Sequence, residues 1–69
     1  MKLSARNQIK GKIIEVKKGA TTAHVRVEIA PGQVITSSIT NEAVDELKLK
    51  AGDAAFAIIK ASDVMIGVA

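Results

Sequence analysis

Cysteine is absent from the chain, and histidine and aromatic residues are scarce, with one His, one Phe and no Trp or Tyr. Without cysteine there is no disulfide and no thiolate ligand for a metal, and His24 alone does not assemble a structural zinc centre. A domain of 69 residues has a limited core, and oligomerisation is the remaining way to supplement it. We therefore expect the chain to associate with copies of itself.

The sequence also lacks the groups that catalysis needs. A nucleophile requires a neighbouring base, and general acid–base chemistry requires poised carboxylates. His24 lies on a predicted strand face with no evident partner, and Gly11-Lys12 lacks the preceding glycine of a phosphate-binding loop. We expect a binding protein and no enzyme.

Long apolar runs are missing as well. Polar residues follow Met1-Lys2-Leu3, and no stretch approaches the roughly 18 to 20 apolar residues of a membrane span. The net charge of +3 favours anionic partners only weakly. We expect a single domain over residues 1–69 that is cytoplasmic and binds neither a membrane nor nucleic acid.

Two short stretches near the ends of the chain are rich in hydrogen-bond donors and positive charge. They are Ser4-Ala5-Arg6-Asn7-Gln8 and Lys60-Ala61-Ser62. Neither contains a carboxylate, thiol or imidazole, so together they suit an anion and not a metal cation. The alternative is that Ser4 and Asn7 merely start a strand while Lys60 is a solvated charge.

Alternating apolar and polar residues predict the strands that lie between these stretches. A first strand covers residues 7–17, and its phase changes near Ile13-Ile14, which predicts a bulge. Residues 22–30 alternate regularly and form the second strand. Pro31-Gly32 has the sequence of a type II turn, so we expect a hairpin with a third strand over residues 34–39.

A short helix, capped by Thr40 or Asn41, follows the third strand. We expect a fourth strand over residues 53–60 and a fifth over residues 64–68. This order predicts a mainly all-β fold, a small five-stranded OB-like barrel with one helix between strands three and four. A flat antiparallel meander is the alternative.

Closure of such a barrel would place strand one beside strand four. The two donor-rich stretches would then meet, within one chain or across a dimer. An OB-type module that binds single-stranded nucleic acid is the alternative function. It would need aromatic platforms, worth about 1 to 3 kcal/mol per stacked base, and only Phe56 is available.

Four motifs spread over nearly the whole chain resemble one known family. They are Ser4-Ala5-Arg6-Asn7-Gln8-Ile9-Lys10-Gly11, Ser38-Ile39-Thr40, Leu47-Lys48-Leu49-Lys50-Ala51-Gly52 and Ile58-Ile59-Lys60-Ala61-Ser62-Asp63-Val64. The family is that of the Mop proteins or molbindins, small cytoplasmic proteins that bind molybdate. The resemblance implies an OB-like barrel assembled as a homohexamer, a trimer of dimers, with oxyanion sites at subunit interfaces.

The same resemblance assigns a set of residues to the oxyanion pocket. They are Ser4, Ala5, Arg6, Thr40, Lys60, Ala61 and Ser62. Molybdate is a tetrahedral dianion whose oxygens only accept hydrogen bonds, so hydroxyl, backbone N–H and cationic donors suit it. A role as a plain helix cap stays open for Thr40. The implied ligand is molybdate or tungstate, free or bound to a pterin, with no directly coordinated metal cation, and the implied function is intracellular storage, buffering or homeostasis.

Overall fold

The computed structural model describes all residues from Met1 to Ala69. It contains four strands, one α-helix and one turn of 3-10 helix. They are β1 (Asn7–Lys18), β2 (Thr22–Ala30), β3 (Gln33–Thr40), α1 (Asn41–Leu47), β4 (Ala54–Ile59) and η1 (Ala61–Asp63). The predicted mainly β fold, with one short helix between the third and fourth strands, is confirmed.

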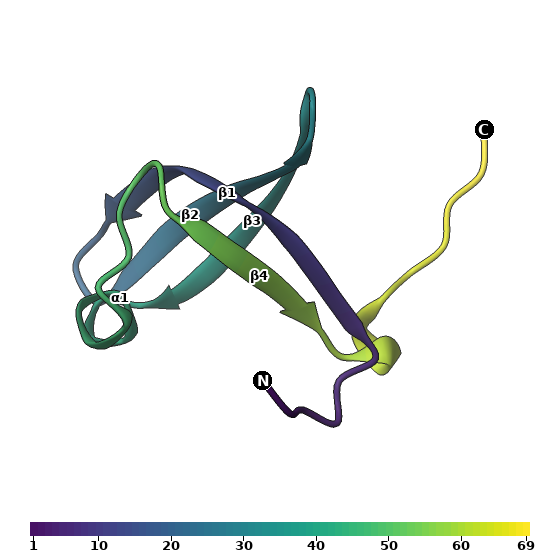
Figure 1. Cartoon of the computed structure of the whole chain (residues 1–69), viewed down its shortest axis with the longest axis horizontal. Helices are drawn as coiled ribbons and strands as arrows, with labels where there is room; N and C mark the ends of the chain where they lie inside the picture. Colours follow the sequence, from purple (N-terminus) through teal and green to yellow (C-terminus); the bar gives the residue numbers. More distant parts are fainter.

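The strands form one antiparallel sheet in the order β3-β2-β1-β4. The predicted pairing of the first and fourth strands is therefore confirmed, and the flat meander, in which β4 would follow β3, is wrong. The sheet is strongly twisted, and β3 and β4 lie at its two edges (Figure 1). The prediction of a barrel needs correction in one respect, because the sheet of this chain is open.

The strand β1 pairs with two neighbours, one along each half of its length, and it contains a bulge. Residues Asn7 to Lys12 pair with β4, whereas Lys12 to Lys18 pair with β2. The register with β2 shifts between Ile13 and Glu15, where the sequence predicts the bulge. Ile13 is fully buried and Ile14 is exposed, so the bulge resets which residues face the core.

The core is small and consists of five buried residues. Ile13, Ala23, Val25 and Val27 come from the inner face of the sheet, and Val44 comes from α1. The Pro31-Gly32 turn joins β2 to β3, and Gly32 has the positive φ of 76° that a type II turn requires at this position. The helix has only seven residues, and no helix of the structure is long and apolar enough to span a bilayer.

The predicted fifth strand over residues 64–68 is wrong for this chain. Beyond η1 no residue belongs to a strand, and the tail extends away from the sheet (Figure 1). The residues Met65, Ile66 and Val68 are 92%, 87% and 95% exposed. The sequence has the apolar character of a strand, but a strand also needs a neighbour for its N–H and C=O groups, and the tail has none here.

Gly11 permits the close approach of β1 to β2. A Cβ atom at this position would lie 2.6 Å from the carbonyl oxygen of Glu28 and 2.7 Å from Cγ1 of Val27. These atoms belong to the backbone and to a buried side chain, so neither moves aside easily. A side chain at residue 11 would therefore displace β2 from the bulged part of β1.

We predict that Gly11→Ala lowers the free energy of unfolding by about 2 kcal/mol, because overpacking in a core typically costs about 1 to 3 kcal/mol. Chemical denaturation followed by circular dichroism measures this change. Lys10→Ala is the matched control, since it places alanine at the adjacent exposed position of the same strand. Equal stability of the two variants would contradict the assigned close approach.

Candidate functional site

A hollow of about 590 Å³ lies where β1 begins and β4 ends. Its lining consists of Ser4, Ala5, Arg6, Ile58, Lys60, Ala61, Ser62 and Asp63. The hollow therefore brings together every residue that the sequence assigned to the oxyanion pocket, except Thr40.

The pairing of β1 with β4 creates this hollow. Asn7 lies opposite Ile59 in the antiparallel register, so the residues that precede Asn7 and those that follow Ile59 emerge at the same corner of the sheet. The Asn7 side chain fixes this corner, because its Nδ2 donates a hydrogen bond of 3.2 Å to the Ile59 carbonyl. Gln8 Nε2 donates a bond of 3.0 Å to the Ala5 carbonyl and turns the preceding segment.

The turn of 3-10 helix shapes the opposite wall. The N–H of Asp63 donates to the Lys60 carbonyl at 2.8 Å, and the N–H of Val64 donates to the Ala61 carbonyl at 3.2 Å. This tight turn changes the direction of the chain after β4. It places the side chains of Lys60 and Ser62 beside those of Ser4 and Arg6.

The polar groups of the hollow are free to bind a ligand. The ion pairs of the chain join Lys18 to Asp45 and Arg26 to Glu15, so neither Arg6 nor Lys60 is neutralised by a carboxylate. The hydroxyls of Ser4 and Ser62 make no hydrogen bond within the chain. The arrangement offers two cations and two hydroxyls to an acceptor-only anion.

Asp63 and Ile58 line the hollow but are missing from the predicted set. Asp63 adds a carboxylate, which lowers the net positive charge of the hollow, and Ile58 adds an apolar wall. The period of two along β4 could have suggested Ile58, which lies two positions before Lys60. No group of three or more His, Cys, Asp or Glu side chains is placed to hold a metal ion.

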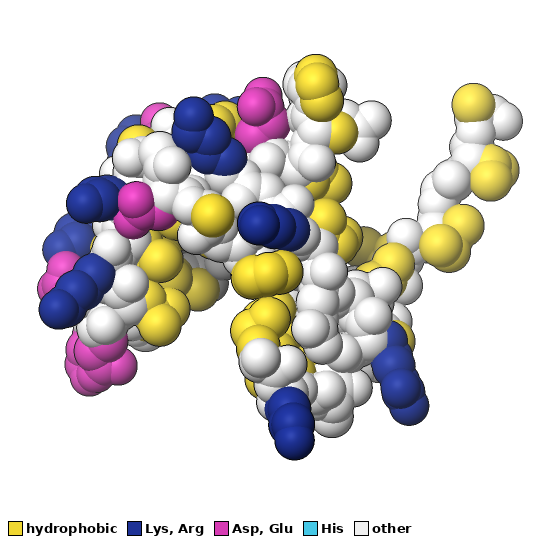
Figure 2. Space-filling view, viewed as in Figure 1, with side chains coloured by type: hydrophobic (Ala, Val, Ile, Leu, Met, Phe, Trp, Pro, Cys, Tyr) yellow, Lys and Arg dark blue, Asp and Glu magenta, His cyan; other side chains and the backbone are white.

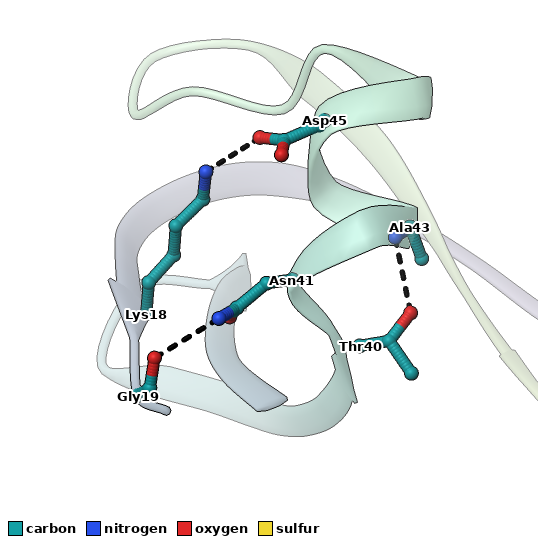
Figure 3. A network of polar contacts seen from close by, with 6 residues as sticks. All are labelled: Lys18, Gly19, Thr40, Asn41, Ala43 and Asp45. Atoms are coloured by element: carbon teal, nitrogen blue, oxygen red, sulfur yellow. Dashed lines mark hydrogen bonds and ion pairs between the residues drawn. The ribbon is translucent and has the colours of Figure 1, made fainter. Parts of the chain in front are cut away.

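Thr40 lies outside the hollow, at the junction of β3 and α1. It is the N-cap of α1, and its hydroxyl accepts a hydrogen bond of 3.0 Å from the N–H of Ala43 (Figure 3). The alternative role as a helix cap is therefore present in the structure. A contact between Thr40 and the ligand stays a prediction, and within one chain Thr40 does not share the hollow with Arg6 and Lys60.

Comparisons with known proteins identify the family to which the chain belongs. The family described as the TOBE domain matches residues 3–66. Molybdenum-pterin-binding protein 1 of Clostridium pasteurianum is 53% identical over 66 residues, which cover 96% of this chain and 97% of the relative.

Two solved structures have the same fold. MopII from Clostridium pasteurianum has a TM-score of 0.89 and 49% identity, covering 97% of this chain and 100% of the other. The cytoplasmic molybdate-binding protein ModG, with molybdate bound, has a TM-score of 0.92 and 46% identity, covering 100% of this chain and 49% of the other.

The role of Thr40 as a helix cap can be tested by substitution. Thr40→Val removes the hydroxyl at nearly constant volume, so we expect it to lower the free energy of unfolding by about 1 kcal/mol, the usual cost of losing an N-cap. Thr40→Ser keeps the hydroxyl and should retain most of the stability. Thermal denaturation monitored by circular dichroism measures the stability of each variant. A valine variant as stable as the serine variant would show that the cap contributes nothing to the stability of the fold.

Proposed function

The chain belongs to the TOBE domain family and, within it, to the Mop group of molybdenum-pterin-binding proteins, and on that premise we propose that it binds molybdate in the hollow between Arg6 and Lys60. The observation that carries this proposal is the meeting of two unpaired cations and two free hydroxyls at one corner of the sheet.

The chemistry of the ligand matches these groups. Each hydrogen bond between a charged donor and an oxyanion contributes on the order of 1.5 to 3 kcal/mol. Arg6 supplies a planar fork that reaches two oxygens, and Lys60 supplies a compact charge. Ser4 and Ser62 donate hydroxyl hydrogen bonds, and the small side chain of Ala61 leaves room for the anion.

The lining also bears on the form of the ligand. Relatives are named for binding molybdenum-pterin, and a pterin ring stacks best on an aromatic side chain. None of the lining residues is aromatic. This composition favours the free oxyanion, and tungstate, which has the same shape and charge, is an equivalent ligand in our proposal.

We propose that a second subunit completes each site. The hollow is open to solvent and lacks Thr40, which the family resemblance places beside the ligand. Since Thr40 lies at the β3–α1 junction, away from the Asn7 end of β1, it can approach the hollow only from another copy of the chain. The site then lies at a subunit interface.

The apolar surface of the chain supports such an assembly. A groove of about 500 Å³ between the sheet edges is lined mainly by apolar residues of β3, β4 and the α1–β4 connection, among them Ile35, Leu49 and Ala57. Hydrophobic side chains also cover the extended tail (Figure 2). We propose that the tail of one copy packs along an open edge of another, within a homohexamer built as a trimer of dimers.

The cellular role in this proposal is storage or buffering of molybdate in the cytoplasm, without catalysis. The ModG protein, 46% identical to this chain, is described as a cytoplasmic molybdate-binding protein. Nucleic acid is a weaker candidate ligand. Phe56 is 51% exposed and lies opposite Lys10, but a single aromatic platform does not hold a strand of several bases.

We predict that Arg6→Ala or Lys60→Ala weakens molybdate binding by about tenfold or more, which corresponds to about 1.4 kcal/mol or more. Arg6→Lys should recover part of the affinity, since it restores the charge without the fork. Isothermal titration calorimetry with molybdate, tungstate, sulfate and phosphate measures both affinity and selectivity. Lys10→Ala, an exposed lysine of β1 outside the hollow, is the matched control.

Two results would overturn the proposed function. One is a folded wild-type protein that shows no saturable binding of molybdate. The other is tight binding of a single-stranded oligonucleotide at physiological salt, where a nonspecific charge attraction should be weak. A wild-type affinity in the Arg6→Ala and Lys60→Ala variants would instead move the site away from this hollow.

Binding and assembly should be linked if two subunits share the site. A ligand that binds only the assembled form stabilises it by about 2.7 kcal/mol at a hundredfold excess over Kd. Molybdate should therefore raise the melting temperature, and Ile66→Asp should produce smaller species that bind molybdate poorly. Ile66 is 87% exposed in the single chain, so its substitution acts through association and not through the core.

Light scattering combined with calorimetry tests this linkage. Ala51→Asp introduces the same charge at an exposed turn and serves as the control. A wild-type monomer that binds molybdate with full affinity at micromolar concentration would disprove the shared site.

A further inference from the structure

The two walls of the hollow have no direct hydrogen bond between them. The N-terminal wall consists of residues 4–6, which precede β1, and the C-terminal wall consists of residues 60–62, which follow β4 (Figure 1). The ladder between the two strands ends at the pair of Asn7 and Ile59. No backbone or side-chain hydrogen bond of the chain joins residues 4–6 to residues 60–62. Another feature must therefore set the distance between the walls.

The side chain of Asn7 joins the two walls at their base. Its Nδ2 donates a hydrogen bond of 3.2 Å to the carbonyl of Ile59, and this bond is partly buried. The Ile59 carbonyl and the Lys60 N–H belong to one planar trans peptide group, in which the two point in opposite directions. A donor that fixes the carbonyl therefore also fixes the direction of the Lys60 N–H and the start of the C-terminal wall.

Gln8 acts in the same way on the N-terminal wall. Its Nε2 donates a bond of 3.0 Å to the Ala5 carbonyl, whose peptide group carries the Arg6 N–H. Gln8 also lies opposite Ile58, which lines the hollow. Since successive side chains of a strand lie on opposite faces of the sheet, the bonds of Asn7 and Gln8 hold this corner from both faces.

The neutrality of these two side chains matters for the anion. A carboxylate at either position would attract Arg6 and Lys60 away from a ligand, whereas an ammonium would itself attract the anion. An amide donates hydrogen bonds and carries no charge. Asn7 and Gln8 do not line the hollow, so they hold its walls without occupying the space of the anion.

Fixed walls discriminate between anions by size. Molybdate and sulfate are both tetrahedral dianions whose oxygens accept hydrogen bonds, and molybdate is the larger. Charge and the number of donors therefore do not separate the two anions, whereas the spacing of the donors does. A spacing fixed for the larger anion leaves the smaller one with longer and weaker hydrogen bonds.

We propose that Asn7 and Gln8 are positioning residues, which hold Arg6 and Lys60 at a spacing that fits molybdate better than sulfate. This inference rests on the proposed binding of molybdate in the hollow. Walls that are already held lose little further freedom when the ligand binds, which favours affinity. Without either bond, molybdate must order the walls and sulfate can draw them closer, so the preference for molybdate decreases.

Calorimetric titration of the assembled protein with molybdate, and with sulfate in competition, tests this preference. Asn7→Leu and Gln8→Met each keep the approximate size of the side chain and remove the donor. We expect each variant to bind molybdate about fivefold more weakly, the effect of about one net hydrogen bond, and to show a smaller ratio of the sulfate Kd to the molybdate Kd. Gln33→Met is the matched control, because Gln33 of β3 makes no side-chain hydrogen bond and does not line the hollow.

Backbone relaxation measured by NMR on the free protein separates positioning from a general loss of stability. We expect the amides of Arg6 and Lys60 to gain fast motion in both variants, while the amide of Val25 in the core keeps its wild-type order. Ile29→Val is a second control. It trims a residue packed against the core, so it should lower stability and leave the preference for molybdate unchanged.

Three results would overturn the positioning role. They are a wild-type protein that binds both anions equally, a wild-type preference and wild-type relaxation in Asn7→Leu and Gln8→Met, and an equal loss of preference in Gln33→Met or Ile29→Val. A wild-type protein that shows no saturable molybdate binding would instead overturn the proposed function. Because the relaxation measurement needs no ligand, it then still decides whether the two amides hold the walls.

Discussion

The antiparallel pairing of β1 with β4 is the interaction on which the rest of the structure depends. Asn7 and Ile59 are 52 residues apart in sequence, yet they are partners in the sheet. β1 pairs with β4 as far as Lys12 and with β2 from Lys12 onward, and the bulge between Ile13 and Glu15 lies within the second part. Ile13 adds two backbone bonds to the loop before β4, one from Gly52 at 2.8 Å and one to Asp53 at 2.9 Å. Without this pairing, the donors at the two ends of the chain would not form a site.

Surface ion pairs contribute little to the stability of the fold, and this explains how Arg6 and Lys60 can remain unpaired. Exposed pairs such as Lys18–Asp45 and Arg26–Glu15 contribute roughly 0 to 1 kcal/mol each, so leaving Arg6 and Lys60 without partners costs the fold little. The same cations interact more strongly with a dianion, which accepts several charge-assisted hydrogen bonds at once. Asp63 reduces the positive charge of the hollow without pairing with either cation. The hollow therefore keeps its capacity to bind an anion at a small cost in stability.

The sequence predicts those features that local patterns encode. The phase change at Ile13-Ile14 locates the bulge, Pro31-Gly32 locates the hairpin, and pairing of the first and fourth strands then locates the hollow. Two features were beyond local patterns. Thr40 carries one signal that suits both a helix cap and a ligand contact, and the sequence does not separate them. The tail over residues 64–68 has the composition of a strand, but strand formation depends on a neighbour that this chain does not provide.

The open sheet and the open hollow have a common physical cause. A chain of this size buries only five residues, so its β3 and β4 edges, its apolar groove and its tail all remain without cover. Unpaired strand edges and exposed apolar side chains are unfavourable in water and favour association with a complementary surface. Each copy of the chain carries both halves of such a contact, an apolar tail and an apolar groove. In our proposal, association completes the sheet and brings Thr40 of one subunit toward the cations of another, which couples the stability of the fold to the occupancy of the site.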